Sequence, residues 1–230
     1  MSAKSERTRE RILRAAERLF AEHGYDGVSV RDIGAAAEVQ IALISYYFKN
    51  KEGLYRAVFQ RRIEPVSAQR RAALQQLLAR KKPLPTIVDV LDALARPWVE
   101  LRDKRGGQHY TRLIAREVGD PNEARRGIVK DMLDPIAEEF IAAMEQVLPG
   151  RPRADNHWAY HFFIGALLLV LVNPERTHRL SGRLCDMSDG PAVLDHIVGF
   201  FSRALEGDKR PAKPKARQTR MGKPRMGKRA

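Results

Sequence analysis

The sequence has a single cysteine, Cys185, among its 230 residues and no long hydrophobic run. One cysteine cannot form an intramolecular disulfide, which is typical of proteins in a reducing cytoplasm. Residues 1–12 contain no apolar stretch, so they do not read as a signal peptide. The most apolar segment, Phe162 to Val172, is too short to span a bilayer. We therefore expect a cytoplasmic protein with no membrane partner.

No segment alternates polar and apolar residues with the period of two that a half-buried β-strand requires. Apolar residues instead recur at helical spacing along the chain, and a hydrophobic content of 43% is enough for a folded core. We predict an all-α protein with an N-terminal three-helix domain (1–60), a larger helical domain (61–207) and a tail (208–230). Pro65 is expected to break or kink the helix that begins at Lys51.

The formal charge of +14 suggests a nucleic-acid partner, but most of this charge is at one end of the chain. Residues 208–230 carry ten Lys or Arg and one Asp, which leaves only +5 on the rest. A segment so rich in Lys, Arg, Pro and Gly cannot bury enough apolar surface to fold, so we predict a disordered tail. It either adds non-specific affinity for DNA or serves as a solubilising appendage.

The segment from Ser29 to Leu54 organises the N-terminal domain. It reads as two short helices at a tight turn, followed by the start of a third helix. Ser29 is a candidate N-cap, and Asp32 three residues later completes a short capping box. Ile44 and Phe48 close a small core over the turn. Between Val39 and Phe48, five side chains lie on a face that the core does not use: Gln40, Ala42, Ser45, Tyr46 and Tyr47.

Asn50 and Lys51 mark the start of the third helix. Asn50 is a suitable cap, whereas Lys51 places a positive charge in the first turn, where the helix dipole favours a negative one. This position is understandable if an external anion, such as a DNA phosphate, binds at the amide-rich end of the helix.

At these residues the sequence resembles the TetR family of bacterial transcriptional regulators. The resemblance rests on TRERILRAAERLFAEHGYDGVSVRDIGAAAEV, on the aromatic pair before Phe48 and on KNKEGLYRAVF. It covers about a quarter of the chain strongly, between Thr8 and Phe59, and the remainder only in length and helical pattern. Three positions depart from the family pattern: Glu38 replaces a common Gly, Gln40 a capping Ser or Thr, and Ser45 a frequent Tyr.

The resemblance implies a helix-turn-helix that binds a double-stranded DNA operator. It assigns DNA contacts to Ser29, Arg31, Gln40, Ile41, Ala42, Ser45, Tyr46, Tyr47 and Lys51. Tyr47 and Lys51 are expected on phosphates, and the residues expected at the major groove are Arg31, Gln40, Ile41, Ala42, Ser45 and Tyr46. The residue types agree with this assignment. Arginine can pair with guanine, glutamine with adenine, and Ile or Ala can contact a thymine methyl group.

The segment from Asn156 to Asn173 is apolar on nearly all sides, and Asn156 is its candidate N-cap. It is either a central core helix or one half of a dimer face shared with the last helix. The family resemblance implies a homodimer in which two such helices from each subunit form a four-helix bundle. The predicted interface residues are Gly165, Leu168, Val193, Ile197 and Phe201.

A pocket for a small-molecule effector is expected between helices of the larger domain. Its candidate residues are Trp98, His109, Tyr110, Arg112, Leu113, Phe140, Trp158 and Phe162, although aromatic residues at helical spacing usually belong to the core. His109 and Arg112 could meet a carboxylate, or they could belong to an exposed basic face. His157 and His161 have the spacing of metal ligands, but nothing nearby completes a set, so we expect no metal and no cofactor.

No arrangement of Ser, His and Asp suggests catalysis, and no Gly-rich loop suggests phosphate transfer. The favoured interpretation is a ligand-responsive repressor, not an enzyme, that a small molecule releases from a palindromic operator, with a leaning toward acyl or aromatic carboxylic acids. One alternative is an architectural DNA-binding protein without a ligand. Another is an α-helical enzyme or carrier with a start that resembles a DNA-binding domain.

Overall fold

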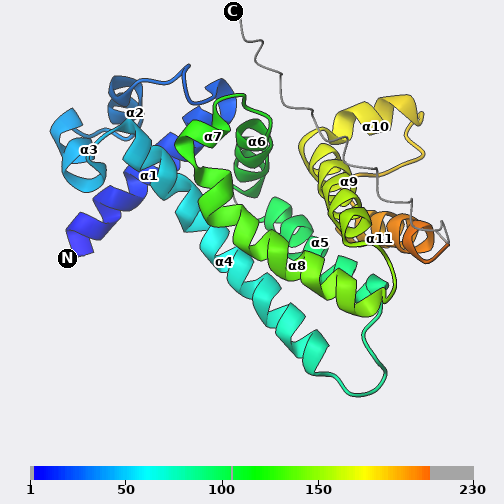
Figure 1. Ribbon diagram of the computed structural model, residues 1–230. Coiled ribbons are helices and arrows are strands. Elements are labelled where there is room, and N and C mark those ends of the chain that lie inside the picture. Colours follow the sequence, from blue (N-terminus) through cyan, green and yellow to red (C-terminus); the bar gives the residue numbers. More distant parts are fainter. Residues whose placement is uncertain (1–2, 105, 208–230) are drawn as a thin grey trace, which may run out of the picture.

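The computed structural model describes residues 3–104 and 106–207, so the predicted basic tail lies outside the described residues. Every regular element in these two ranges is a helix, which confirms the predicted all-α fold (Figure 1). The elements are α1 (Ala3–His23), α2 (Val30–Ala36), α3 (Ile41–Phe48), α4 (Lys51–Ala79), α5 (Ile87–Asp103), α6 (Gly107–Val118), α7 (Glu123–Arg126), a π-helical turn η1 (Val129–Leu133), α8 (Asp134–Val147), α9 (Arg153–Val172), α10 (Pro174–Leu180) and α11 (Gly190–Gly207).

Helices α1 to α3 form one end of the molecule, with the start of α4 packed against them (Figure 1). The apolar stripe of α1 is fully buried at Ile12, Leu13 and Phe20. Gly24 ends the helix at φ +76°, and its amide donates to the Phe20 carbonyl at 2.9 Å. This is the left-handed C-terminal geometry for which glycine is the least strained residue.

Helix α4 continues through Pro65, so a break at this residue, one of the two predicted outcomes, is wrong. The proline removes one backbone hydrogen bond, but Ile63, Val66 and Leu74 keep one continuous buried face on both sides of it. Tertiary packing of that face outweighs the local cost of the proline. The proposed domain boundary at residue 60 therefore falls inside a helix, and no linker separates the two regions.

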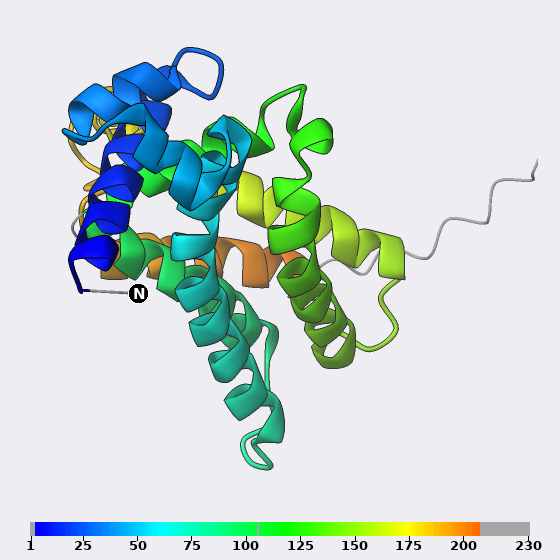
Figure 2. The same cartoon turned by 90° about the vertical axis from the view of Figure 1, so that its left-hand side faces the viewer.

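Helix α5 lies at the centre of the larger domain, where it packs against α4, α6, α8, α9 and α11. Thr86 and Asp89 form a capping box at its N-terminus. Leu91, Leu94 and Ala95 are fully buried. The loop between α4 and α5 lies at the end of the molecule farthest from the helix-turn-helix (Figures 1 and 2).

Helix α9 begins at Arg153, three residues before the predicted cap at Asn156. Asn156 is instead fully buried inside the helix, and neither end of its amide has a hydrogen-bond partner. Arg153 and Ala154 are exposed, so the first turn can form in solvent and the helix extends beyond its apolar part.

None of the helices among the described residues is by itself long and apolar enough to cross a membrane. Taken together, α9 and α10 reach the required length and hydropathy, but the two are bent by 86° with respect to each other.

Candidate functional site

The N-terminus of α2 is fixed by the predicted capping box. The Ser29 hydroxyl accepts a hydrogen bond from the Asp32 amide at 3.1 Å, and the Ser29 amide donates to the Asp32 carboxylate at 2.8 Å. The hydrogen bonds from the Ser29 side chain and backbone lower the pKa of Asp32. Two otherwise unpaired amides are thus satisfied, which sets the direction in which α2 enters the turn.

The turn between α2 and α3 depends on Glu38 and Gly34. Glu38 has φ +51°, the left-handed region that glycine normally occupies, so the family's usual glycine is replaced at some cost in strain. The Glu38 carbonyl accepts a hydrogen bond from Arg11 on α1 at 3.3 Å. A Cβ on Gly34 would lie 3.2 Å from the Val39 carbonyl oxygen, so the absence of a side chain lets the turn pack closely against α2.

Helix α3 has one buried and one exposed face. Ile44 is fully buried and Phe48 is 5% exposed, whereas Tyr46 is 78% exposed. Also exposed are Ser29 and the other side chains predicted at the major groove: Arg31, Gln40, Ile41, Ala42 and Ser45. Gln40 makes no side-chain bond to the first turn of α3. The structure therefore leaves these side chains accessible to a partner in solution.

Tyr47 and Lys51, the predicted phosphate contacts, are both half-buried and have partners within the protein. The Tyr47 hydroxyl lies 2.8 Å from the Ser5 hydroxyl on α1. The Lys51 ammonium lies 4.3 Å from the centre of the Tyr25 ring. This cation–π contact gives a second physical reason for a lysine in the first turn of α4, independent of DNA.

A buried polar network lies behind Tyr25, and sequence reasoning did not find it. Glu117 on α6 accepts hydrogen bonds from the Tyr55 hydroxyl at 2.9 Å and from Arg126 at 3.0 Å. Arg126 also pairs with Asp120 at 2.9 Å, and its guanidinium lies over the Tyr25 and Tyr55 rings. Although burial lowers the pKa of Arg126, its bonds to Glu117 and Asp120 outweigh that effect and raise it.

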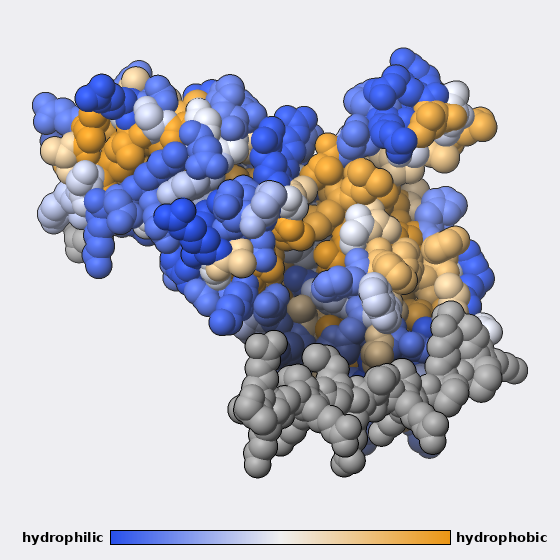
Figure 3. All heavy atoms as spheres, turned by 45° about the horizontal axis from the view of Figure 1, so that its top comes forward, coloured by the Kyte–Doolittle hydropathy of each residue, from blue (hydrophilic) through white to orange (hydrophobic). Residues whose placement is uncertain are grey.

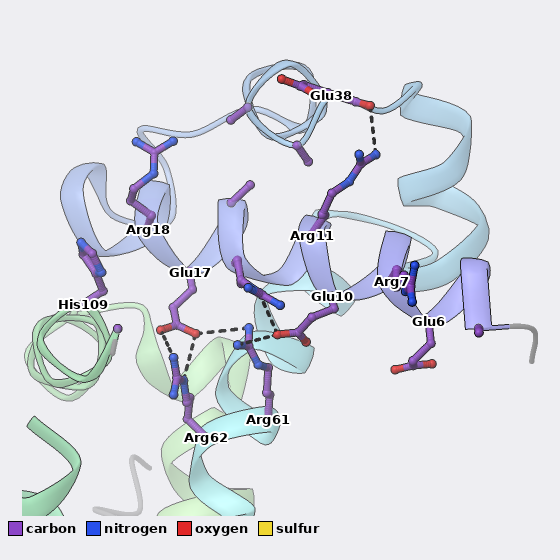
Figure 4. Close-up of a pocket in the computed structure, with 16 residues that line it drawn as sticks. Glu6, Arg7, Glu10, Arg11, Glu17, Arg18, Glu38, Arg61, Arg62 and His109 are labelled. Carbon is purple, nitrogen blue, oxygen red and sulfur yellow. Dashed lines mark hydrogen bonds and ion pairs between the residues drawn. The ribbon is translucent and has the colours of Figure 1, made fainter. Parts of the chain in front are cut away.

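A groove of about 1200 Å³ runs beside α1, and charged side chains line most of it (Figure 4). Glu17 is 3% exposed and pairs with Arg62 at 2.9 Å and Arg61 at 3.5 Å, so it fastens α1 to α4. Gly106 allows α6 to begin at the same place, because a Cβ there would lie 2.7 Å from Arg62. The buried carboxylate at the groove is therefore already paired, and it joins the two parts of the molecule.

The predicted effector residues do not assemble as one set. Leu113, Phe140, Tyr110 and Trp98 are buried in the larger domain, and the last two stack with ring centres 5.9 Å apart. Trp158 and Phe162 are 62% and 60% exposed, which corrects their assignment to the same pocket.

The two basic candidates for the effector pocket, His109 and Arg112, also lie outside the buried group of Trp98, Tyr110, Leu113 and Phe140. Arg112 is exposed, and His109 lines the groove beside α1. The period of α6 explains this, because Tyr110, Leu113 and Ile114 take the inward face and leave Arg112 outside. The buried cation in this region is Arg70 of α4, which sequence reasoning missed.

The predicted dimer residues are likewise divided between two faces. Val193 and Ile197 are only 5% and 9% exposed, because α11 turns them inward where it packs on α5. Leu168 and Phe201 are half-buried, and Gly165 is exposed. The exposed apolar side chains of α9 and α11 are Trp158, Phe162, Leu169 and Phe200. Hydrophobic residues gather on the side of the molecule that carries α9 and α10 (Figure 3).

Helices α1 to α3 form a three-helix unit in which α3, the helix after the turn, has an exposed face, and this unit packs on a larger helical domain. These features define the class of helix-turn-helix DNA-binding regulators. Two family models match the chain: "Bacterial regulatory proteins, tetR family" over residues 12–58 and "Tetracyclin repressor-like, C-terminal domain" over residues 92–203. The chain belongs to the TetR family of DNA-binding transcriptional regulators, as its sequence motifs predicted.

Curated relatives include the HTH-type transcriptional regulator YttP of Bacillus subtilis, 49% identical over 47 residues, which are 20% of this chain and 23% of YttP. The HTH-type transcriptional dual regulator CecR of Shigella flexneri is 27% identical over 140 residues, which are 59% of this chain and 62% of CecR. The chain thus spans less than two thirds of the length of these relatives.

Solved structures share the fold over most of the chain. The fatty acid degradation regulator FadR of Bacillus halodurans matches with a TM-score of 0.59 at 21% identity, over 86% of this chain and 98% of FadR. FadR of Bacillus subtilis, solved in complex with stearoyl-CoA, matches with a TM-score of 0.58 at 18% identity, over 84% of this chain and 97% of that FadR chain. SmeT in its complex with triclosan matches with a TM-score of 0.53 at 22% identity, over 84% of this chain and 90% of the SmeT chain.

Proposed function

We propose that this protein is a cytoplasmic, ligand-responsive repressor that binds a palindromic operator as a homodimer and leaves it when a small molecule binds the larger domain. The observation that carries the proposal is the uninterrupted α4, which begins beside the exposed face of α3 and passes into the core of the larger domain. A ligand that favours one packing of that core over another therefore acts on a helix that also supports the DNA-binding surface.

The solved relatives with bound small molecules support a ligand-responsive function. FadR of Bacillus subtilis holds stearoyl-CoA and SmeT holds triclosan, and both share the helical architecture of this chain. A repressor of this kind requires a ligand that binds the DNA-competent state less tightly, since only differential affinity moves the equilibrium.

Dimerisation is proposed through the exposed apolar face of α9 together with Phe200 of α11. An apolar face with Trp158, Phe162 and Leu169 in contact with water is unfavourable for a monomer. A two-fold dimer covers it and supplies the second recognition helix that a palindrome requires.

Different residues of the helix-turn-helix region are proposed to contact the bases and the phosphates of DNA. Gln40 and Arg31 are exposed and have donors that suit base edges, so Gln40→Ala or Arg31→Ala should cost about 1–3 kcal/mol on the operator and relax one base position. Lys51→Ala should weaken binding to operator and unrelated DNA alike and reduce the salt slope by about one.

The test is a footprint on genomic fragments, followed by fluorescence anisotropy with the protected sequence. The proposal requires one discrete palindrome, released when ligand that co-purifies with the protein is added back. Leu184→Asp, at an exposed site of the larger domain, is the control variant and should bind DNA normally. Uniform protection without a palindrome would instead favour an architectural protein.

A further inference from the structure

Arg70 is a buried cation without an ionic partner. It lies on the inward face of α4, in line with Val66 and Leu74, and is 2% exposed. Its Nε and Nη2 atoms have no hydrogen-bond partner, and no carboxylate of the described residues forms an ion pair with it. Its guanidinium instead lies 5.2 Å from the centre of the Phe140 ring and 5.8 Å from that of Trp98.

Other buried polar groups without partners lie on the helices that pack around α4. The Trp98 indole N–H and the Tyr110 hydroxyl are unpartnered, and the two rings stack on each other. Both ends of the Asn156 amide are unpartnered as well, and Asn156 lies one helical turn before Tyr160 on the buried face of α9. Burial lowers the pKa of Arg70, whereas its charge interaction and side-chain hydrogen bond with Tyr160 raise it. That bond is to a neutral hydroxyl group, and it leaves Nε and Nη2 of Arg70 without a partner.

So many buried polar groups without partners lower the stability of the fold. A desolvated guanidinium is costly unless it is paired, and an apolar residue of similar length at this position is commonly neutral or stabilising. Ring contacts offset only a small part of that cost. The unpartnered groups are also mostly donors: two guanidinium N–H groups, an indole N–H and an amide N–H₂. What the cluster lacks is an acceptor that carries negative charge.

The geometry of the unpaired atoms indicates which anion fits. Nε and Nη2 lie on the same edge of the guanidinium, the edge that pairs with the two oxygens of a carboxylate in parallel. One carboxylate would balance the single charge of Arg70, whereas a doubly charged phosphate would bring an excess negative charge into the core. The surrounding Trp98, Phe140 and Tyr110 rings suit an apolar or aromatic group attached to the acid.

We propose that the Arg70 cluster is the binding site for the carboxylate of a small organic acid with an apolar tail, and that this acid is the effector. The inference rests on the proposed ligand-responsive function and assigns the ligand's chemical class to this region. Side chains of α4, α5, α6, α8 and α9 meet here, so seating the acid requires the rings to move apart. Because Arg70 belongs to α4, that movement acts on the helix that begins beside α3.

The experiment uses the full chain and two pairs of probes with matched tails: octanoate with 1-octanol, and 3-phenylpropionate with 3-phenyl-1-propanol. Thermal-shift and calorimetric titrations compare the parent protein, Arg70→Met and Arg71→Met. Arg71 is the matched control because it is the next residue on α4, is 42% exposed and pairs with Glu139 at 2.7 Å.

An acid of at least one pair should bind the parent protein and Arg71→Met more tightly than its alcohol. In Arg70→Met the affinity for that acid should fall about 30-fold or more, since a desolvated charged partner is lost. Without any probe, Arg70→Met should melt at the same temperature as Arg71→Met or higher, because an uncompensated buried charge has been removed.

Three results would overturn the assignment. One is equal acid binding by Arg70→Met and the parent protein. Another is an unliganded Arg70→Met that melts well below Arg71→Met, which would make Arg70 a structural residue. The third is that neither acid binds the parent protein better than its alcohol.

Operator release, measured separately by anisotropy, distinguishes this inference from the proposed function. If an acid binds through Arg70 and leaves the operator complex intact, the site stands and the release mechanism is wrong. If a neutral compound releases the operator equally well from the parent protein and Arg70→Met, the release mechanism stands and the carboxylate site is wrong.

Discussion

Glu117 and Arg126 offer a test of whether the buried network behind Tyr25 behaves as one unit. The Glu117 side chain is fully buried and that of Arg126 is 7% exposed, with 2.8 Å between Arg126 Nη2 and a Glu117 carboxylate oxygen. Breaking such a pair from one side leaves a buried charge, which typically costs about 3–5 kcal/mol. The two sides differ here, because Arg126 has a second partner in Asp120.

We therefore expect Glu117→Leu to lower the free energy of unfolding by about 2–3 kcal/mol, since Asp120 still balances Arg126. Arg126→Met should cost more, about 3–5 kcal/mol, because Glu117 would keep only the Tyr55 hydroxyl. The double variant Glu117→Leu with Arg126→Met should lose only about 1 kcal/mol, mostly for the unpaired Tyr55 hydroxyl.

Urea denaturation followed by circular dichroism, at one fixed protein concentration, measures these differences. Glu139→Gln is the control, since its pair with Arg71 is largely solvated and should contribute about 0–1 kcal/mol. The reasoning is refuted if the double variant loses the sum of the two single losses, because additive effects would mean that the two charges do not compensate each other.

Three further predictions concern other parts of the chain. The pKa of Asp32 is lowered from its ordinary value of 3.8, so its capping contribution is complete above that pH and is lost as the pH falls through the folded value. Asp32→Asn should therefore flatten the decline in melting temperature between about pH 5 and pH 3; an unchanged decline would contradict the role of the cap. Phe162→Asp should give monomers by light scattering, whereas Leu184→Asp should keep the oligomeric mass of the parent, and identical masses would exclude this face of α9. Pro65→Ala should raise the free energy of unfolding by about 1–3 kcal/mol in the urea assay, because it restores a backbone hydrogen bond at an exposed site; lower stability would contradict this reasoning.

The helix-turn-helix was predictable because its determinants are local. The Ser29–Asp32 cap, the buried positions Ile44 and Phe48, and the Asn50 cap are all set within a few residues of one another. The same reasoning failed at Pro65, where the packing of a distant helix decides whether the helix continues. It also failed for Val193 and Ile197, because periodicity identifies an apolar face of α11 without saying whether α5 or a second subunit covers it.

The buried charges were missed although the sequence contains a signal for them. Glu17, Arg70 and Glu117 each interrupt an apolar stripe at helical spacing, between residues such as Leu13 and Phe20 in α1. A charged residue within an apolar stripe predicts a buried charge that has a partner, but the sequence does not identify that partner. Glu17 pairs with α4, Glu117 with α4 and α7, and Arg70 with none of the described carboxylates.

The uninterrupted α4 gives the molecule a lever arm. Fourteen residues separate Lys51 from Pro65, which at helical rise is about 21 Å. Ion pairs from Arg61 and Arg62 to Glu17 tie the arm to α1, while the part beyond Pro65 packs against α5 and α8. The proline weakens α4 at the point where its contacts change from α1 to the helices of the larger domain. A bend of about 10° at that point would displace Lys51 by about 4 Å, which is more than half the width of a DNA minor groove. In the proposed two-fold dimer both arms would swing, so a small rearrangement near Arg70 would produce a mismatch between the two recognition helices and the spacing of their half-sites.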